Sequence, residues 1–150
     1  TLPSSVLRIK SCAFYGCSKL SVVSVPIGVT SIGDGAFAQS GLTSVTVPDS
    51  VTSIGSGAFR ACGSLESAKL SGGIDLIESH TFYECRSLKS VEIPSGVTYI
   101  GNNAFNYCES LTSVKFGGTT GEWKTVDKSL FWNSNTAEYT VTCSDGTVGK

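Results

Sequence analysis

The chain has 150 residues, of which 40% are hydrophobic and 15% are charged, and its formal net charge is −1. This near-neutral balance argues against nucleic acid or an anionic membrane surface as the main partner. No apolar run approaches the roughly 18–20 residues that a membrane-spanning helix needs, and the length fits a single domain.

One pattern dominates the sequence, which repeats with a period of 23 residues. A fixed period in this range indicates one supersecondary unit stacked on copies of itself, rather than a conventional globular core. Because a residue that recurs in every repeat belongs to the architecture, a function has to lie where the repeats differ. The recurring residues are Leu42, Leu65, Leu88 and Leu111; Ile54, Ile77 and Ile100; Phe59, Phe82 and Phe105; and Cys62, Cys85 and Cys108.

The chain begins inside a repeat. Leu2 and Pro3 match the end of a strand, and Val6 and Ile9 follow at the spacing of the later repeats. We therefore expect a fragment of a longer protein, without a complete first strand to cap the stack. Exposed apolar edges at Leu2, Val6 and Ile9, together with a partly covered strand edge over residues 20–25, predict self-association through this uncapped N-terminal coil.

Within each repeat, the residue types predict three segments, shown most clearly by the third repeat. Val45 and Val47 alternate with polar neighbours, which is the period of a half-buried strand, and Pro48 ends it because proline has no N–H to donate. Residues 51–54 carry an apolar residue at every third position and are expected to form a second extended or turning segment. Residues 57–62 are too few for a stable helix, so we expect a single helical or 3₁₀ turn.

The fourth repeat departs from this pattern. Ser71 stands where the neighbouring repeats have proline, and Glu78 stands where they have glycine. The glycine of this slot, Gly55 in the third repeat, is expected to adopt a backbone conformation that a side chain would obstruct. We therefore predict that the coil bulges at the fourth repeat.

After residue 116 the repeat decays. Thr119 and Glu122 have the spacing of a capping box, which predicts a short helix, and Trp123 on this helix is placed to plug the last coil. We expect repeats over residues 1–116, with a partial first repeat and about four full ones. Residues 117–150 are expected to form a C-terminal cap, because solenoids need capping units for solubility.

Further signals lie within this C-terminal segment. Residues 130–132, Leu-Phe-Trp, add a bulky apolar cluster, and residues 139–143 alternate polar and apolar side chains as a strand does. The run Ser-Asp-Gly-Thr at residues 144–147 is a turn signal. We expect these elements to cover the open end of the stack.

The unit at residues 42–62, LTSVTVPDSVTSIGSGAFRAC, resembles the BspA-like, or Treponema-type, leucine-rich repeat. The segments GTTGEWK and TVTCSDGT resemble the tail that often closes such arrays, so the resemblance covers essentially the whole chain. It implies an α/β solenoid, a right-handed, curved leucine-rich-repeat coil with a parallel β-sheet and with short helical or 3₁₀ turns on the other side. It also implies an extracellular or cell-surface location in bacteria or some protozoa, and a role in adhesion to host matrix proteins or other cells. No N-terminal apolar run marks a signal peptide.

Six cysteines invite a disulfide or metal interpretation. Four of them share one inward slot, which Ser40 completes, and stacked parallel side chains do not converge as a disulfide requires. We expect these thiols to be buried and to pack as small apolar groups, while Cys12 and Cys143 are free or paired elsewhere. Without a Cys-x-x-Cys pair and with a single histidine, no zinc site and no other cofactor is predicted. The cysteines of the column are Cys17, Cys62, Cys85 and Cys108.

Two other motifs carry little chemistry. Residues 33–38 match G-x-G-x-x-A, but the string begins again at Gly55, which marks a repeat turn rather than a nucleotide site. His80 has Glu78 and Glu84 nearby in sequence but no nucleophile motif, so a surface histidine is expected rather than a catalytic one. We therefore predict no enzymatic activity.

Two groups of outward side chains are candidate binding surfaces. One lines the sheet side, since concave solenoid faces often bind ligands, although a solvated Ser/Thr-rich face without a ligand is an equal alternative. The other lies on the turn side and includes Asn106. It is a candidate because exposed tyrosine and arginine commonly anchor protein interfaces. Tyr99 is a further candidate, at a slot that otherwise holds mostly serine. The sheet-side set is Ser44, Thr46, Glu66, Lys69, Glu92 and Lys115, and the turn-side set is Arg60, Tyr83 and Tyr107.

The sequence favours a non-enzymatic leucine-rich-repeat binding module of a bacterial cell-surface or secreted protein. Its partner would be a protein or glycan at a cell surface, a host matrix protein among them. Two alternatives stay open. A structural spacer in a larger surface protein would tolerate mutation of every outward position. An accessory domain of an enzyme, including one that binds glycans, would need a pocket with convergent polar groups.

Overall fold

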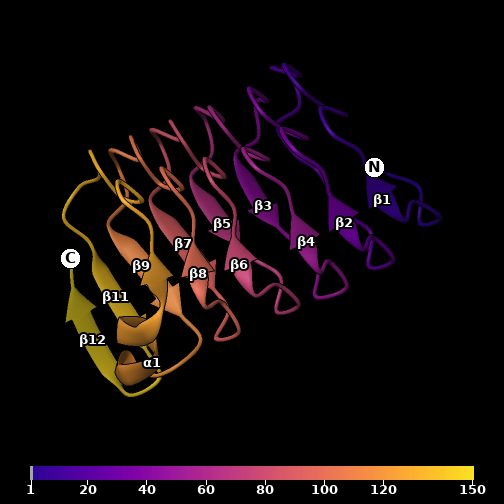
Figure 1. Cartoon of the computed structure of the whole chain (residues 1–150). Coiled ribbons are helices and arrows are strands. Elements are labelled where there is room, and N and C mark those ends of the chain that lie inside the picture. The colour runs from indigo at the N-terminus through magenta and orange to yellow at the C-terminus, as the bar shows by residue number, and fades with distance from the viewer. Residues whose placement is uncertain (1) are drawn as a thin grey trace.

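A computed structural model of the chain describes residues 2–150. The chain winds into a stack of coils, with the N-terminus at one end and helix α1 and strand β12 at the other (Figure 1). Successive coils contribute parallel strands to the same sheets, and paired residues lie about one repeat apart in sequence. This confirms the predicted solenoid of 23-residue repeats with a parallel sheet and little helix.

One side of the stack is a six-stranded sheet of order β3–β5–β7–β9–β11–β12, parallel except for the β11–β12 hairpin. The register keeps equivalent repeat slots opposite each other, so that Val45 pairs with Ala68 and Val91 with Val114. These inward residues are buried and alternate with outward polar ones. The strands are β3 (Ser44–Thr46), β5 (Ser67–Lys69), β7 (Ser90–Ile93), β9 (Ser113–Phe116), β11 (Thr140–Cys143) and β12 (Gly146–Gly149).

A second set of two-residue strands follows another side of the stack and confirms the predicted second extended segment. It is divided into two parallel groups, β1–β2–β4 and β6–β8–β10. The division lies between the third and fourth repeats. The strands are β1 (Arg8–Ile9), β2 (Ser31–Ile32), β4 (Ser53–Ile54), β6 (Leu76–Ile77), β8 (Tyr99–Ile100) and β10 (Asp127–Lys128).

The division of this ladder coincides with Glu78, at a slot where adjacent coils approach closely. A Cβ built on Gly101, at the equivalent slot of the next coil, would lie 2.5 Å from the backbone nitrogen of Ser79, and one built on Gly55 would lie 2.5 Å from that of Asp34. At Gly55 and Gly101 the absence of a Cβ therefore avoids a clash with the preceding coil, although Ser129, at the same slot of the last coil, also donates to the preceding coil, to the Ile100 carbonyl at 2.9 Å. Glu78 fills this slot in the fourth repeat, where β4 and β6 do not pair, and the predicted irregularity of that repeat takes the form of a gap in this ladder.

The turn side has a hydrogen-bond ladder of its own. Each turn is closed by i→i−3 bonds of the 3₁₀ type, such as the one from the Ala58 N–H to the Gly55 carbonyl at 3.2 Å. Alternate N–H groups instead bond to the next coil, as Phe59 donates to the Thr81 carbonyl at 3.0 Å. Two residues per coil, four positions apart, adopt left-handed φ angles, and Gly57 (φ +61°) is one of them. The segment therefore forms repeated turns and does not wind into a helix.

Stacked phenylalanine rings run through the core. Neighbouring rings lie 5.2–5.6 Å apart between centroids, with interplanar angles of 1–14°. Trp132 meets the last ring edge-on at 6.2 Å and ends the stack. Burying each such side chain contributes about 1.5–3 kcal/mol, and each coil depends on its neighbours for that burial. The stacked residues are Phe14, Phe37, Phe59, Phe82 and Phe105.

The cysteine column is buried in three of its four predicted members, and all six cysteines are free. The Cys85 thiol donates to the Phe59 carbonyl of the preceding coil at 3.1 Å, and Cys62 and Cys108 make the equivalent contacts. The prediction is wrong for Cys17, which is exposed. Cys17 belongs to the first coil, so no preceding coil in the structure supplies a carbonyl or covers its thiol.

Helix α1 (Thr120–Thr125) begins with the predicted capping box. The Thr119 hydroxyl accepts a hydrogen bond from the Glu122 N–H at 3.2 Å, and the Glu122 carboxylate accepts one from the Thr119 N–H at 2.7 Å. The hydrogen bonds from Thr119 lower the pKa of the Glu122 carboxyl. Trp123 is buried, with its ring 5.2 Å from that of Phe116, and so closes the last coil as expected.

Residues 117–150 also extend the ladders of the repeats. Strand β10 pairs with β8, and β11 pairs with β9. The turn ladder continues as well, because the Phe105 N–H donates to the Trp132 carbonyl at 2.7 Å. The expected apolar cluster at 130–132 is wrong for Leu130 and Phe131, which are 78% and 62% exposed. Phe131 occupies a left-handed turn position (φ +59°), whose side chain points outward.

The N-terminal end also differs from expectation. Residues 20–25 form no strand, which leaves β3 as the edge of the large sheet. Ile9 is buried and Leu2 and Val6 are half-buried, because these inward slots pack against the core. The exposed apolar side chains of this end are instead Leu7, Val22 and Ile27. Self-association through this end stays a prediction.

The close approach of the backbone at Gly101 predicts that Gly101→Ala destabilises the protein. The added Cβ would lie 2.5 Å from the Ser79 backbone nitrogen, so urea denaturation should show a loss of about 1–3 kcal/mol in the free energy of unfolding, the usual cost of overpacking. Gly63→Ala is the matched control, because a Cβ there meets nothing within 4 Å. Equal losses in the two variants would contradict this prediction.

The burial of the thiols predicts a two-step reaction with a colourimetric thiol reagent at pH 8. Burial raises the pKa of Cys108 to about 12 and also raises the pKa of Cys62, Cys85 and Cys143, and the thiolate is the reactive form. Two thiols, those of Cys12 and Cys17, should react quickly, and the other four only after unfolding in guanidinium. A third fast thiol in the native protein would contradict this arrangement, and the double variant C12S/C17S should show none.

Candidate functional site

The large sheet places the predicted sheet-side residues in rows across the coils. Its register sets Thr46 opposite Lys69, Lys69 opposite Glu92, and Glu92 opposite Lys115. Ser44 begins a neighbouring row of hydroxyl side chains that continues through the serines of β5, β7 and β9. The rows are outward-facing, so the structure brings the sheet-side set together on one surface.

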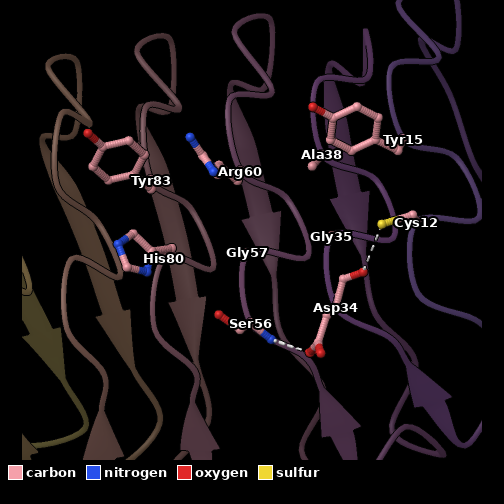
Figure 2. Close-up of a pocket in the computed structure, with 10 residues that line it drawn as sticks. All are labelled: Cys12, Tyr15, Asp34, Gly35, Ala38, Ser56, Gly57, Arg60, His80 and Tyr83. Atoms are coloured by element: carbon pink, nitrogen blue, oxygen red, sulfur yellow. Dashed lines mark hydrogen bonds between the residues drawn. The ribbon is translucent and has the colours of Figure 1, made fainter.

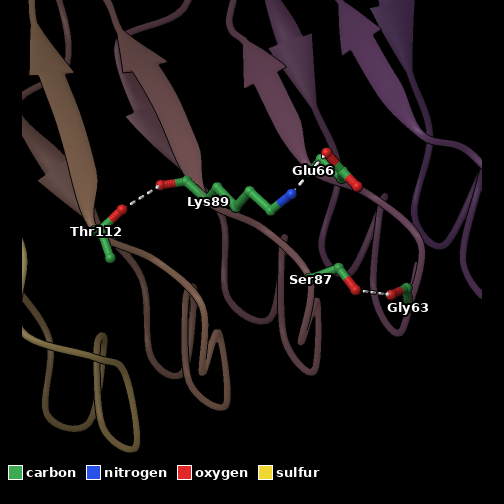
Figure 3. A network of polar contacts seen from close by, with 5 residues as sticks. All are labelled: Gly63, Glu66, Ser87, Lys89 and Thr112. Atoms are coloured by element: carbon green, nitrogen blue, oxygen red, sulfur yellow. Dashed lines mark hydrogen bonds and ion pairs between the residues drawn. The ribbon is translucent and has the colours of Figure 1, made fainter.

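The charges on this surface are paired with one another. The Glu92 carboxylate lies 3.9 Å from the Nζ atoms of both Lys69 and Lys115. The Glu66 carboxylate accepts a hydrogen bond from Lys89 at 2.9 Å, while the Lys89 carbonyl accepts one from the Thr112 hydroxyl (Figure 3). Exposed ion pairs contribute about 0–1 kcal/mol each. They stabilise the fold little, but they leave the sheet surface without an unpaired charge cluster.

The turn-side set forms a chain of contacts across three coils. The Arg60 guanidinium carbon lies 5.5 Å from the Tyr83 ring centroid, and the Tyr83 and Tyr107 rings meet edge-on at 5.8 Å. The Arg86 guanidinium carbon lies 5.8 Å from the Tyr107 centroid. Such cation–π contacts are worth about 0.5–1 kcal/mol at exposed sites. We call these four residues the Arg–Tyr cluster.

Two other predicted surface residues lie elsewhere. Asn106 is buried rather than outward, which corrects the prediction, because its amide donates to Asn103 at 2.8 Å and accepts from Asn135 of the next coil at 3.1 Å. Tyr99 is exposed on β8, where its hydroxyl lies 2.7 Å from that of Ser129. Tyr99 therefore belongs to the second ladder and is separate from both candidate surfaces.

A hollow of about 380 Å³ crosses the turn side of the first four coils (Figure 2). Its volume lies within the range of about 300–1,000 Å³ that is usual for small-molecule sites. Tyr15 stands at one end of the hollow, and Tyr83 of the Arg–Tyr cluster stands at the other. Its lining residues are Cys12, Tyr15, Asp34, Gly35, Ala38, Ser56, Gly57, Arg60, His80 and Tyr83.

The polar side chains of the hollow are held by neighbours. The Asp34 carboxylate accepts a hydrogen bond from the Ser56 N–H at 2.9 Å. The half-buried His80 packs its ring edge-on against Tyr83 at 5.4 Å, and its Nε2 lies 3.3 Å from the side-chain nitrogen of Asn103. The expectation of a surface histidine is therefore only partly met, since His80 forms part of a wall.

The hollow does not combine its cysteine and histidine into a catalytic pair. Cys12 and His80 occupy the same left-handed turn position in coils three apart. Neighbouring strands of a sheet are about 4.8 Å apart, so three steps amount to roughly 14 Å, far beyond the hydrogen-bond reach that an activated nucleophile needs. Over residues 2–150, no group of three or more His, Cys, Asp or Glu side chains is placed to hold a metal ion.

Sequence reasoning missed this hollow, although a signal was present. Tyr15, Ala38, Arg60 and Tyr83 each follow the core phenylalanine of their coil. When this position is compared across the four coils, Ala38 is a small residue between larger ones, which indicates a gap in the surface. Within the described residues no helix has the length and apolar character to cross a membrane.

The chain is similar to known leucine-rich repeat proteins. The family model "BspA type Leucine rich repeat region" matches it in six copies, over residues 1–112 and 75–148. The crystal structure of a T. pallidum leucine-rich repeat protein is 31% identical over 73% of this chain and 52% of its own, with a TM-score of 0.67. A leucine-rich repeat protein from Bacteroides ovatus is 25% identical over 95% of this chain and 49% of its own, with a TM-score of 0.56.

Among curated proteins none matches the chain. The chain spans about half the length of the two solved structures. The 23-residue period, the buried repeat slots and the family match agree over nearly the whole sequence. The chain therefore belongs to the BspA-type leucine-rich repeat family.

Proposed function

We propose that this chain is a non-enzymatic binding module of a bacterial cell-surface or secreted protein, which adheres to host matrix proteins or to other cells. The Arg–Tyr cluster is the observation that supports this function best. Tyrosine and arginine are enriched among the residues that dominate the free energy of protein association. The contacts across coils fix these side chains in advance, which reduces the entropy they lose on binding.

The fold does not require the residues of this cluster. The slot of Tyr107 is the second left-handed position of its coil, and the other coils fill it with unrelated residues. An architectural role would demand one residue type in every repeat, as the phenylalanine slot does. The residues at the corresponding positions of the earlier coils are Gly16, Gln39, Ala61 and Glu84.

The scaffold suits adhesion because it holds outward side chains at fixed spacing. Hydrogen-bond ladders on the sheet side and the turn side connect successive coils, so that several weak contacts along the stack can engage one partner together. The secreted or surface-attached character that the family resemblance implies supports the proposed location. The roughly 14 Å between Cys12 and His80 argues against a catalytic role for the hollow.

The proposal predicts saturable binding of the protein to one or more immobilised host matrix proteins, measured by biolayer interferometry. The double variant Y83A/Y107A should bind at least about 30-fold more weakly, since a hot-spot residue costs about 2 kcal/mol or more when truncated. Tyr99→Ala is the matched control, because Tyr99 is an exposed tyrosine outside the cluster, and it should bind as the unmodified protein does.

Two results would contradict the proposal. One is the absence of binding to every matrix protein and to whole cells, which favours a structural spacer. The other is equal binding by the unmodified protein and the double variant, provided that both have the same thermal unfolding midpoint, which would exclude the Arg–Tyr cluster as the contact surface.

A further inference from the structure

The floor of the turn-side hollow is open because two of its positions are glycines, which the fold does not require there. Gly35 and Gly57 hold the first left-handed position of their coils, at φ +58° and +61°. Other coils carry bulkier residues at this position with nearly the same φ, so the backbone conformation alone does not require glycine there. The other residues at this position are Cys12, His80, Asn103 and Phe131, with φ between 56° and 60°.

The two ends of the hollow are aromatic. Tyr15 is 52% exposed and presents its ring at one end. Tyr83 occupies the equivalent position three coils later and stands at the other end. His80 and Arg60 contact Tyr83 and hold its ring in place. Ala38, in the slot between Tyr15 and Arg60, keeps the space between the ends clear.

The hollow contains one carboxylate and one guanidinium that form no ion pair within the described residues. Asp34 is exposed, and its carboxylate accepts a single backbone hydrogen bond, so acceptor capacity remains. Arg60 is exposed and, within residues 2–150, forms no ion pair with a carboxylate. The two charges are opposite, so the site has no excess positive charge with which to select an acidic ligand.

The backbone of the floor is already hydrogen-bonded. The N–H groups of Gly35 and Gly57 donate to the carbonyls of Ser56 and Ser79 in the next coils, at 2.9 and 3.0 Å. An extended peptide that binds by strand addition needs free backbone partners, and these groups do not supply them. Recognition here depends on side chains, through ring faces and through a donor and an acceptor for hydroxyl groups.

We propose that this hollow binds a neutral oligosaccharide, with the apolar face of one pyranose ring on Tyr15 and with hydroxyl groups along the oligosaccharide hydrogen-bonded to Asp34 and Arg60. Each pyranose has an apolar C–H face and a rim of hydroxyls that both donate and accept, which matches a hollow lined by aromatic rings, one carboxylate and one guanidinium. This inference rests on the binding function proposed above and names one ligand class for it. The hollow is distinct from the outer part of the Arg–Tyr cluster around Tyr107 and Arg86.

The test is a titration of the protein with a panel of neutral oligosaccharides built from glucose, galactose, mannose or xylose, followed by isothermal calorimetry. At least one should bind saturably. Tyr15→Ala should weaken that binding about tenfold, the upper range for the loss of one aromatic contact. Tyr99→Ala is the control for a tyrosine outside the hollow and should leave the affinity unchanged.

Gly57→Asn provides a second variant, which fills the floor without disturbing the fold. Asn103 occupies the same position natively at φ +57°, and a Cβ on Gly57 meets only ordinary contacts, the shortest being 3.6 Å to Arg60. This variant should unfold at the same temperature as the unmodified protein and lose the oligosaccharide. Should it fail to fold, the comparison of Tyr15→Ala with Tyr99→Ala decides the question.

Three results would overturn the inference. They are the absence of saturable binding to every neutral oligosaccharide, binding that survives both Tyr15→Ala and Gly57→Asn, and binding restricted to acidic oligosaccharides and abolished by salt. If matrix proteins bind through the Arg–Tyr cluster while no oligosaccharide binds, the adhesive function stands and the oligosaccharide site alone is excluded. If neither class of ligand binds, both proposals fail.

Discussion

Successive coils of this solenoid approach one another closely enough for backbone hydrogen bonds to form on the turn side and, from β3 onward, on the sheet side as well. This spacing brings the phenylalanine rings within 5.2–5.6 Å of one another and closes the apolar slots against water. It also determines where a Cβ would meet the backbone of a neighbouring coil. At Gly101 a Cβ would meet the backbone of the preceding coil, and at Glu78, where one is present, the second ladder is interrupted.

The same constraint leaves the outward turn positions free. Their left-handed backbone is imposed by alternation between bonds within a turn and bonds to the next coil, yet residues as different as Gly57, His80 and Phe131 adopt it. The scaffold thus separates two kinds of position. Inward positions need the same residue type in every coil because they pack against the equivalent position of the neighbouring coil. The residue types at outward positions are not constrained by this packing.

This separation explains what could be predicted from the sequence. The period identified the inward slots, because burial in a stack needs the same residue type in every coil, and the capping box at Thr119 depends only on local spacing. Cys17 and Asn106 were placed wrongly because their exposure depends on whether another coil covers them, which slot identity alone does not say. The hollow was missed because it arises from small residues at two repeat positions, that of Gly35 and Gly57 and that of Ala38. Such a gap is visible only when the same position is compared across successive coils.

The two candidate surfaces differ in what a ligand has to displace. On the sheet side, Glu92 is shared by Lys69 and Lys115, so a charged partner must compete with pairs that already exist. In the hollow, Asp34 and Arg60 form no ion pair within residues 2–150, and the main chain beneath them is already hydrogen-bonded. A ligand there replaces water around these two side chains and does not have to break an ion pair, while the glycine floor leaves it room. For this reason we propose the turn side, rather than the concave sheet that solenoids often use, as the binding surface of this chain.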